Sequence, residues 1–546
     1  MHKAGCFPRS SGFHDTLEES LRQIEAHGIN PRRVRFLFIQ PPFPEHYLGD
    51  FPVYEPLHVH ILEAVTRDLA ETRLFDGRID SEKDFVRMLK EYRPEIVGST
   101  THMAGEIHRV KELLETAKNH VPGVLTIVGG QHATLLPEDL YDPCVDLICI
   151  GPGEETFREV VQAHIDGRDF TEIDGLAVKQ DRKYVLTKPR RLRSGTFSWP
   201  ALDWTLVSDR YRSRYFTFDQ CPTIYTITTS GCPYRCKFCS LWAAARGTYR
   251  KRSPEDIVDD ICSQPQPYAH LTDDNTFHDE EHAMEIYRLL KARGVKKKIM
   301  AYARTDTIVK RPESLEKWCE VGLQALVVGM EGVTDRHLEA MNKRTNVDVN
   351  IQAHRILEEL KIENWAHFVM MPDFRKEDFD RVWDFVDGMN MPYPVFVPMT
   401  PIPGTPLFFE AKEKGELSVF DYGFYNLTYM VFKTAIPKEE WYRHYLNLYK
   451  KSCSPRTLWR RRTSPSFRIA PALGRAFLFR RAVWRGHSHI RKQLEMEREL
   501  SYEDIEHTLP PSLRRDYVPD KYYNAPTMAQ LRENEAAGMP VTADSL

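Results

Sequence analysis

Short apolar runs alternate with helical patterns along most of the chain, and this alternation is the main structural signal. Between residues 32 and 190 the apolar runs end in glycine or small polar residues; the run 124–128, for example, is followed by Gly129 and Gly130. Amphipathic stretches such as 82–91 separate these runs. Strands that alternate with helices predict a parallel, doubly wound sheet of the Rossmann-like kind, which binds ligands beyond the carboxyl ends of its strands.

The same alternation resumes at residue 223 and continues to residue 420. Six strand-like runs occur there, from 223–230 to 395–399. Because eight such units close a complete barrel, six predict a partial (β/α)6, TIM-like barrel. The carboxyl-end face of such a barrel carries the chemistry, so polar residues at these strand ends form the candidate site.

A chain of 546 residues is too long for one ordinary core, and the pattern divides it into five parts. The overall fold class is α/β. The predicted parts are an N-terminal extension (1–31), a doubly wound domain (32–190), an irregular, aromatic-rich linker (191–222), a partial barrel (223–420) and a helical, basic C-terminal region (421–546). One amphipathic helix is expected in the extension, at 16–27.

Composition and charge indicate the cellular environment of the protein but say little about its function. A formal net charge of -3 indicates no class of partner, so any charge signal has to be local. No apolar run approaches the roughly 20 residues that span a bilayer, and the N-terminus lacks an apolar signal-peptide core, so we expect a cytoplasmic protein. Ten cysteines in a chain of this length do not form a disulfide framework, which indicates a reducing, low-oxygen setting.

Three of these cysteines lie close together in the loop that follows the first barrel strand. Cys232, Cys236 and Cys239 have CxxxCxxC spacing. Three thiolates can bind three irons of a [4Fe-4S] cubane and leave the fourth iron open, whereas ligation by cysteine alone needs four. An open iron can chelate and cleave S-adenosylmethionine (SAM). The simpler alternatives are a zinc site, which would need a fourth ligand, and free buried cysteines.

With an aromatic residue before its last cysteine, this motif resembles that of the radical SAM superfamily. The resemblance implies SAM contacts at successive strand ends of the barrel. The implied SAM residues are Phe238, Thr272, Asp273, Asp274, Asn275, Arg304, Asp306, Glu331, Pro403 and Gly404. Residues 272–275 stand where the superfamily often has Gly-Gly-Glu, and a planar guanidinium suits the SAM carboxylate. Each residue alone could be a turn or a cap, and 342–344 is interpreted as a solvated helix end.

Residues 32–190 resemble the cobalamin-binding domain that is fused to many radical SAM enzymes. Glycines at the strand ends would let a broad, flat ring lie against the backbone, because a Cβ would hold it off. The implied cobalamin residues are Gln40, Ser99, Thr100, Thr101, Gly129, Gly130, His132, Ala133, Gly151 and Glu154. The alternative is a doubly wound domain that has lost its cofactor.

The resemblance departs from the cobalamin proteins that ligate cobalt through a histidine. Those proteins carry DxHxxG after the first strand, and the nearest matches here, at His46 and His102, both lack the aspartate. We therefore expect no protein imidazole on the cobalt. His46, His58, His60 and His102 are interpreted as ordinary helix or loop histidines, and His132 is expected near the cofactor because it lies within the glycine motif.

A local charge signal does occur in the C-terminal region. From Trp441 to Leu494 there is no Asp or Glu, while arginines and lysines are interleaved with aromatic residues. Such a stretch predicts peripheral contact with an anionic membrane surface at the inner face. A merely solvated basic face and a nucleic-acid contact are the alternatives, and the nucleic-acid contact is the less favoured of the two.

Together, residues 32–420 resemble the cobalamin-binding, class B radical SAM methylases, in the branch of hopanoid methylases and the anaerobic Mg-protoporphyrin monomethyl ester cyclase. The resemblance implies that a 5′-deoxyadenosyl radical takes hydrogen from an unactivated carbon and that methylcobalamin supplies the methyl group. The implied substrate is hydrophobic, a hopanoid-like lipid or a natural product, and the implied electron donor is an external flavodoxin or ferredoxin. The alternatives are a cyclase or rearrangement enzyme without net methyl transfer and an RNA-modifying radical SAM enzyme.

Overall fold

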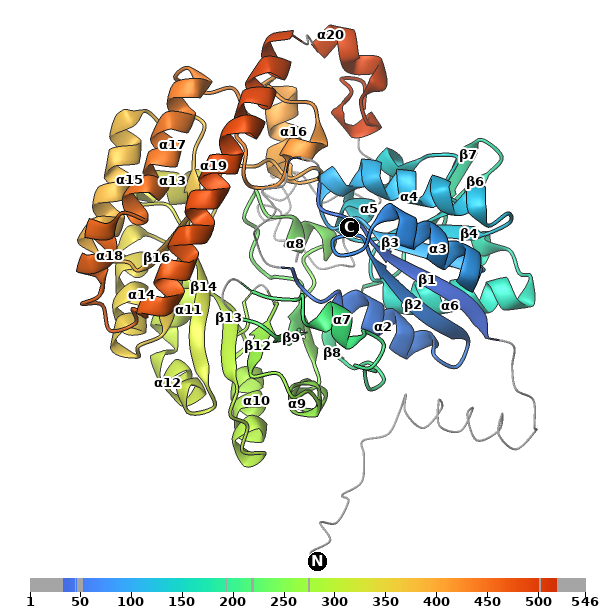
Figure 1. Cartoon of the computed structure of the whole chain (residues 1–546), viewed down its shortest axis with the longest axis horizontal. Coiled ribbons are helices and arrows are strands. Elements are labelled where there is room, and N and C mark those ends of the chain that lie inside the picture. The colour runs from blue at the N-terminus through green and yellow to red at the C-terminus, as the bar shows by residue number, and fades with distance from the viewer. Residues whose placement is uncertain are drawn as a thin grey trace, which may run out of the picture.

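A computed structural model of the chain describes residues 33–517, apart from 45, 47–52, 193, 218, 219, 274, 500 and 501. The helix expected at 16–27 therefore lies outside the described residues, as does Asp274. Two large sheets face each other across the middle of the molecule, and a long C-terminal helix runs along the second one (Figure 1).

The first sheet has seven strands in the order β2-β1-β3-β4-β5-β6-β7. Its strands are β1 (Val34–Gln40), β2 (Ala70–Asp76), β3 (Ile96–Thr100), β4 (Leu125–Gly129), β5 (Leu147–Cys149), β6 (Leu176–Gln180) and β7 (Lys183–Leu186). Strands β1 to β5 are parallel, which confirms the predicted doubly wound arrangement. The antiparallel hairpin β6–β7 was not predicted, because its turn at Asp181 has a positive φ of 54° without a glycine to signal it.

Helices cover both faces of this sheet because the side chains of each strand alternate between the faces. Leu37 and Ile39 of β1 pack in one core cluster with α3 (Glu82–Tyr92) and α4 (Ile107–His120). Phe36 and Phe38 point the other way, to a second cluster with α2 (Leu57–Thr66) and α6 (Gly153–Asp166). The short helix α5 (Gln131–Leu135) follows β4 at the carboxyl edge of the sheet.

The second sheet is the partial barrel, with six parallel strands in the order β16-β15-β14-β13-β12-β9. Its strands are β9 (Thr223–Thr226), β12 (Tyr268–Leu271), β13 (Lys298–Arg304), β14 (Leu323–Glu331), β15 (Glu363–Met370) and β16 (Tyr393–Pro398). Its helices are α8 (Ser240–Ala244), α9 (Pro254–Ser263), α10 (Glu280–Ala292), α11 (Thr305–Lys310), α12 (Pro312–Glu320), α13 (Asp335–Ala340), α14 (Val347–Glu359), α15 (Lys376–Gly388) and α16 (Pro406–Glu413). Within the described residues β9 and β16 do not pair, so the barrel is open as predicted.

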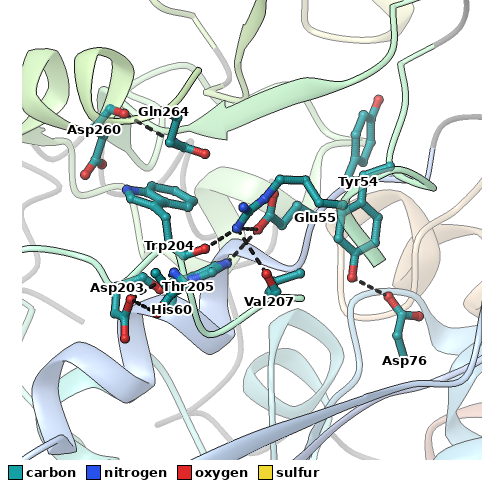
Figure 2. A network of polar contacts seen from close by, with 12 residues as sticks. Tyr54, Glu55, His60, Asp76, Asp203, Trp204, Thr205, Val207, Asp260 and Gln264 are labelled. Atoms are coloured by element: carbon teal, nitrogen blue, oxygen red, sulfur yellow. Dashed lines mark hydrogen bonds and ion pairs between the residues drawn. The ribbon is translucent and has the colours of Figure 1, made fainter. Parts of the chain in front are cut away.

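The segment between the two sheets is bound to the first one by a polar network (Figure 2). His60 on α2 bonds to Glu55 Oε1 at 2.9 Å and to the backbone oxygen of Asp203 at 3.0 Å. Tyr215 donates to Asp76 Oδ2 at the end of β2, at 3.0 Å. The same segment also joins the second half of the chain through β8 (Gly195–Phe197), which pairs with β11 (Arg250–Arg252), itself paired with β10 (Thr229–Ser230). His60 is thus an ordinary packing histidine, as interpreted.

The C-terminal region is helical, as predicted, and packs on the barrel with α17 (Lys438–Ser452), α18 (Pro455–Arg461), α19 (Ile469–Glu499) and α20 (Tyr502–Ile505). Tyr445 and Tyr449 of α17 are buried against β16, where both donate to the Phe396 oxygen. Trp441, also buried, donates to the Met371 oxygen. The stretch 441–494 is therefore partly core, and only part of it can face a partner. None of the described helices is both long and apolar enough to cross a membrane.

Candidate active site

A cavity of about 430 Å³ lies between the two sheets, at the carboxyl ends of their strands. The first sheet contributes the ends of β3 and β4 and the starts of α5 and α6. The second half contributes Ile227 and 229–231, which lead into the cysteine loop, together with Arg250, Thr272 and Asp273. The cobalamin-side strand ends and the start of the cysteine loop therefore open into one space, although none of the three cysteines lines it.

Six of the ten predicted cobalamin residues line this cavity. They are Ser99, Thr100, Gly129, Gly130, Gly151 and Glu154. Thr101 is buried behind them, where its hydroxyl donates to the Gly129 oxygen at 3.2 Å. Gln40 and Ala133 are also buried and are not among the lining residues.

His132 lies behind the cavity wall, and its side chain points away from the cavity. The imidazole is buried, and its Nε2 bonds to Asp139 Oδ2 at 2.9 Å. His132 does not line the cavity, and the expectation that it lies near the cofactor stays a prediction. His46 is likewise occupied, because its ring stacks on Phe424 at 4.0 Å between centroids.

The deep end of the cavity is an apolar slot between the first sheet and helices α2 and α6. Phe36, Phe38, Leu62, Ile127 and Phe157 line it. A Cβ at Gly151 would meet nothing within 4 Å, so the backbone there is open to a ligand. Cobalamin has a flat base on its nucleotide tail and a broad corrin ring. The apolar slot fits the base, and the open backbone at the glycines beside it fits the ring. Sequence reasoning missed the slot because strand phenylalanines look like ordinary core.

His58, which was interpreted from the sequence as an ordinary helix or loop histidine, lines the cavity and adds a polar group to this slot. Burial lowers the pKa of His58 to about 3, so the ring is neutral. Its Nε2 is buried and has no hydrogen-bond partner within the described residues. An unsatisfied buried nitrogen on a cavity wall is available to bond to a ligand group or to a water molecule.

A glycine turn and two side-chain hydrogen bonds fix the conformation of the cysteine loop. Gly231 begins it with φ of +82°, and a Cβ there would lie 2.2 Å from the Thr248 oxygen. Trp242 Nε1 donates to the Cys236 oxygen at 2.8 Å, and Asn342 Nδ2 donates to the Arg235 oxygen at 2.8 Å. Cys236 is buried, whereas Cys232 and Cys239 are half-buried.

The interpretation of 342–344 as a solvated helix end was wrong for Lys343, although Arg344 is exposed. Lys343 is only 5% exposed, and its Nζ lies 2.9 Å from Glu331 Oε1. Its backbone oxygen accepts from Arg304 Nη2 at 2.7 Å. A run of polar residues resembles a surface turn in sequence, and only the barrel brings it against the ends of β13 and β14.

Arg304 lies next to the cysteine loop. Its Nη1 is 3.7 Å from Cys236 Sγ, its Nε donates to Asp306 Oδ1 at 2.9 Å, and its guanidinium stacks 3.7 Å from the centre of the Tyr234 ring. A buried cation stabilises a neighbouring thiolate. The structure thus gathers Arg304, Asp306 and Glu331, as the sequence predicted, but it ties the guanidinium to protein groups.

The predicted SAM residues that follow β12 differ in whether they reach the cavity. Thr272 and Asp273 line the cavity, although Asp273 already accepts from the nitrogen and hydroxyl of Thr228. Burial raises the pKa of Asp273. Asn275 is buried and its Oδ1 has no partner within the described residues.

Thr272 and Asp273 are the two predicted SAM residues, among those that the structure describes, that line the cavity; the others, which do not line it, are Phe238, Asn275, Arg304, Asp306, Glu331, Pro403 and Gly404. Gly404, with φ of +87°, packs against the first half of the chain, because a Cβ there would lie 2.6 Å from Leu135 Cβ. Phe238 is partly buried against the main core. Pro403, like these two, is not among the residues that line the cavity.

The three cysteines fit a cluster. Within the described residues, no three His, Cys, Asp or Glu side chains are grouped so as to hold a single metal ion. Ligands of a cubane bind different irons and stand further apart than ligands of one ion. The candidate ligands are three cysteine thiolates, and they lie beside the buried guanidinium of Arg304. Cysteine thiolates are the usual ligands of iron–sulfur clusters.

Comparison with known families agrees with both halves of this site. The Radical SAM superfamily matches residues 226–386, and the B12 binding domain matches residues 52–161. The chain is a radical SAM enzyme with a B12-binding domain. Its cofactors are therefore a [4Fe-4S] cluster, SAM and cobalamin.

Several known proteins are similar to this chain over more than two thirds of its length. The hopanoid C-3 methylase of Methylococcus capsulatus is 27% identical over 426 residues, which cover 76% of this chain and 80% of the methylase. The anaerobic magnesium-protoporphyrin IX monomethyl ester cyclase of Cereibacter sphaeroides is 29% identical, over 68% of this radical SAM enzyme and 63% of the cyclase. The solved structure of the methyltransferase TsrM from Kitasatospora setae, with tryptophan substrate and a SAM analogue bound, matches with a TM-score of 0.63 and 17% identity, over 84% of this chain and 99% of TsrM. The last likeness shows the shared fold.

Proposed function

We propose that this enzyme is a cobalamin-dependent C-methyltransferase that acts on an unactivated carbon of a hydrophobic substrate. The observation that carries the proposal is the single cavity onto which both the cobalamin-side residues and the start of the cysteine loop open. When bound, the cluster with SAM supplies the radical that removes a hydrogen atom, and cobalamin supplies the methyl group. An external reductant, flavodoxin or ferredoxin, would deliver the electrons.

The residues of this chain have three tasks in that reaction. Cys232, Cys236 and Cys239 would hold the cluster, and the Arg304 guanidinium stabilises the charge of the thiolate at Cys236. The strand ends at Ser99 and Gly129 would carry cobalamin on the opposite wall. Because the cavity lies between the two sheets, cofactors bound there would shield the reacting carbon from part of the surrounding water.

The cavity wall on the barrel side supports a hydrophobic substrate. Ile227, Leu241, Ala244 and Ala245 line it. Two of the similar proteins are named for a hopanoid and for magnesium-protoporphyrin, which are both large ring systems with extensive apolar surface. We therefore propose a polycyclic lipid or a natural product of similar character.

We also propose a peripheral membrane contact, but through a smaller surface than the whole stretch 441–494. Four large apolar side chains protrude where α18 ends and α19 begins: Trp459, Ile469, Leu473 and Phe477, each more than half exposed. The last three recur at intervals of four residues, so they share one face of α19. Exposed arginines surround them, which suits an anionic lipid surface at the inner face.

Cyclisation without methyl transfer is the second candidate, because a cyclase is among the similar proteins. Incubation of the reconstituted enzyme with a lipid and pigment extract and SAM labelled with a trideuteromethyl group separates the two. Methyl transfer gives a product that carries the labelled methyl in place of a hydrogen. A product that lacks the label while 5′-deoxyadenosine accumulates would favour the cyclase.

A further inference from the structure

A buried polar cluster joins the C-terminal segment to the first sheet. Its four members, His132, Asp139, Tyr422 and Ser512, come from α5, η2 (Pro137–Leu140), η4 (Tyr422–Phe424) and η6 (Pro511–Leu513). None of the four is more than 3% exposed. Burying polar side chains costs desolvation free energy that apolar side chains would not incur, so hydrogen bonds within the cluster have to offset it.

Asp139 is the centre of this cluster. Its Oδ2 bonds to His132 Nε2 at 2.9 Å and accepts from the Ser512 hydroxyl at 2.5 Å. Its Oδ1 accepts from the Ser512 backbone nitrogen at 2.9 Å. The Tyr422 hydroxyl lies 2.5 Å from Ser512 Oγ and 3.4 Å from Asp139 Oδ2. Ser512 thus supplies two of the hydrogen bonds that satisfy a fully buried carboxyl group.

The other end of the cluster is the wall of the cofactor cavity. His132 belongs to α5, whose preceding residue Gly130 and first residue Gln131 line the cavity. The Thr134 hydroxyl, also on α5, donates to the Gly130 oxygen at 2.8 Å and accepts from the Gly151 nitrogen at 3.0 Å. A helix of five residues has little stability of its own, so its position depends on these bonds and on His132.

The C-terminal segment is itself attached to the barrel half. Lys412 on α16 donates to the Ser512 oxygen at 2.8 Å, and Tyr502 donates to the Leu513 oxygen at 2.9 Å. Tyr517 donates to Glu138 Oε2 at 3.2 Å, next to Asp139. The segment therefore spans from the barrel helices to the edge of the first sheet, and the cluster is its contact with that edge.

We propose that Ser512 and Asp139 are positioning residues for cobalamin. Through His132 they hold α5 so that the edge at Gly130 and Gln131 stays in place against the ring. The inference rests on the proposed placement of cobalamin in this cavity. Neither Ser512 nor Asp139 lines the cavity, so their effect on the cofactor passes through α5.

The test is the affinity of the full-length chain for hydroxocobalamin, measured anaerobically by fluorescence quenching after the cluster has been reconstituted. Ser512→Ala removes one hydrogen bond to Asp139 and is expected to weaken binding at least roughly tenfold, which corresponds to about 1.4 kcal/mol. Tyr422→Phe leaves both bonds from Ser512 in place, so a smaller loss is expected. Ser488→Ala is the matched control, because Ser488 is exposed on α19 and bonds only to its own helix at Arg485.

Two more readouts on the same samples separate positioning from general destabilisation. The cluster signal in paramagnetic resonance and the melting temperature without cobalamin are expected to match the wild type in Ser512→Ala. The cob(II)alamin signal is expected to broaden, because the ring is held less firmly. Unchanged cobalamin affinity, or a parallel loss of the cluster and of cobalamin, would overturn the inference. If the wild type itself binds no cobalamin, the proposed function fails with it.

Discussion

Cys236 is the most constrained of the three predicted cluster ligands. It is buried beside Arg304, and its backbone oxygen is held by Trp242. We predict that Cys236→Ala, Cys232→Ala and Cys239→Ala each abolish cleavage of SAM to 5′-deoxyadenosine, since two thiolates do not retain the cluster. Cys262→Ala is the control, because Cys262 is exposed on α9. Cleavage that persists in all three variants would refute the assignment.

Glu106 gives the stability of the enzyme a defined pH dependence. Burial raises the pKa of Glu106 from 4.5 to about 7, although its Oε2 accepts from the nitrogens of His102 and Met103. Between pH 4.5 and about 7, Glu106 therefore keeps its proton in the folded chain and loses it in the unfolded chain. This contribution to stability is complete below pH 4.5 and is lost as the pH rises to about 7.

Replacing Glu106 with Gln keeps the two acceptor bonds and removes the titration. We predict that urea midpoints of Glu106→Gln differ less between pH 5 and pH 7.5 than those of the wild type. Glu115→Gln, an exposed change on the neighbouring helix α4, serves as control and is expected to follow the wild type. Equal pH dependence in all three proteins would contradict the prediction.

At the residue scale, the sequence placed Arg304, Asp306 and Glu331 near one another, and six of its ten cobalamin candidates line the cavity. That these residues contact SAM and cobalamin stays a prediction. The sequence did not indicate that Lys343 is buried or that His132 bonds to Asp139, because the direction of a side chain depends on its tertiary partners. Asp139 and Ser512 are 373 residues apart, and no local pattern connects them.

At the scale of elements, the turn from β4 into α5 determines the shape of the cavity edge. Gly130 has φ of +103°, and a Cβ there would lie 2.4 Å from Thr100 Oγ1 and 2.8 Å from the Thr101 oxygen. We predict that Gly130→Ala lowers the free energy of unfolding by more than Gly123→Ala. Gly123 also has a positive φ, of +80°, but nothing lies within 4 Å of a Cβ placed there. Gly123→Ala therefore measures the cost of the backbone strain alone, about 1–3 kcal/mol.

Denaturant unfolding and cobalamin binding measure the two parts of this prediction. Gly130→Ala is expected to weaken cobalamin binding as well, because Thr100 is on the cavity wall. Gly123→Ala is expected to leave binding unchanged. If the two variants lose equal stability, the close approach of Gly130 to Thr100 is not a constraint.

Most elements followed from the sequence because periodicity records which face of a strand or helix is buried. The doubly wound order and the six barrel strands were predicted on that basis, and both are present. The hairpin β6–β7 was missed because Asp181 takes the left-handed conformation that glycine usually marks. The boundaries of the five predicted parts stay predictions.

At the scale of the whole molecule, the proposed membrane contact is formed by Trp459, Ile469, Leu473 and Phe477. These exposed apolar residues distinguish it from a merely solvated basic face, which would not need them. Arg460 and Arg461 lie outside the proposed contact, because Arg460 pairs with Asp387 and Arg461 is buried. Changing them would test folding more than docking. Arg462, by contrast, is exposed and stacks 3.5 Å from the centre of the Trp459 ring.

We predict salt-sensitive cosedimentation of the chain with vesicles that contain anionic lipid. Binding is expected to fall in a triple variant of the apolar face (Ile469→Asn, Leu473→Asn, Phe477→Asn) and in a triple variant of its arginines (Arg462→Gln, Arg480→Gln, Arg481→Gln). A charge-matched control on the first domain (Lys83→Gln, Lys90→Gln, Lys183→Gln) is expected to bind like the wild type. Wild type that stays in the supernatant at low salt would remove the membrane proposal, and retention on RNA instead would favour the nucleic-acid alternative.

The central claim is that one cavity brings cobalamin and the cluster together across the two facing sheets. A crystal structure of the anaerobically reconstituted chain with cobalamin and SAM tests it most directly. The account predicts the corrin ring at the edge formed by Gly129 and Gly130, its nucleotide base in the slot between Phe38 and Phe157, and SAM on the cluster across the same cavity. Cobalamin bound elsewhere, or separated from the cluster by polypeptide, would contradict the account.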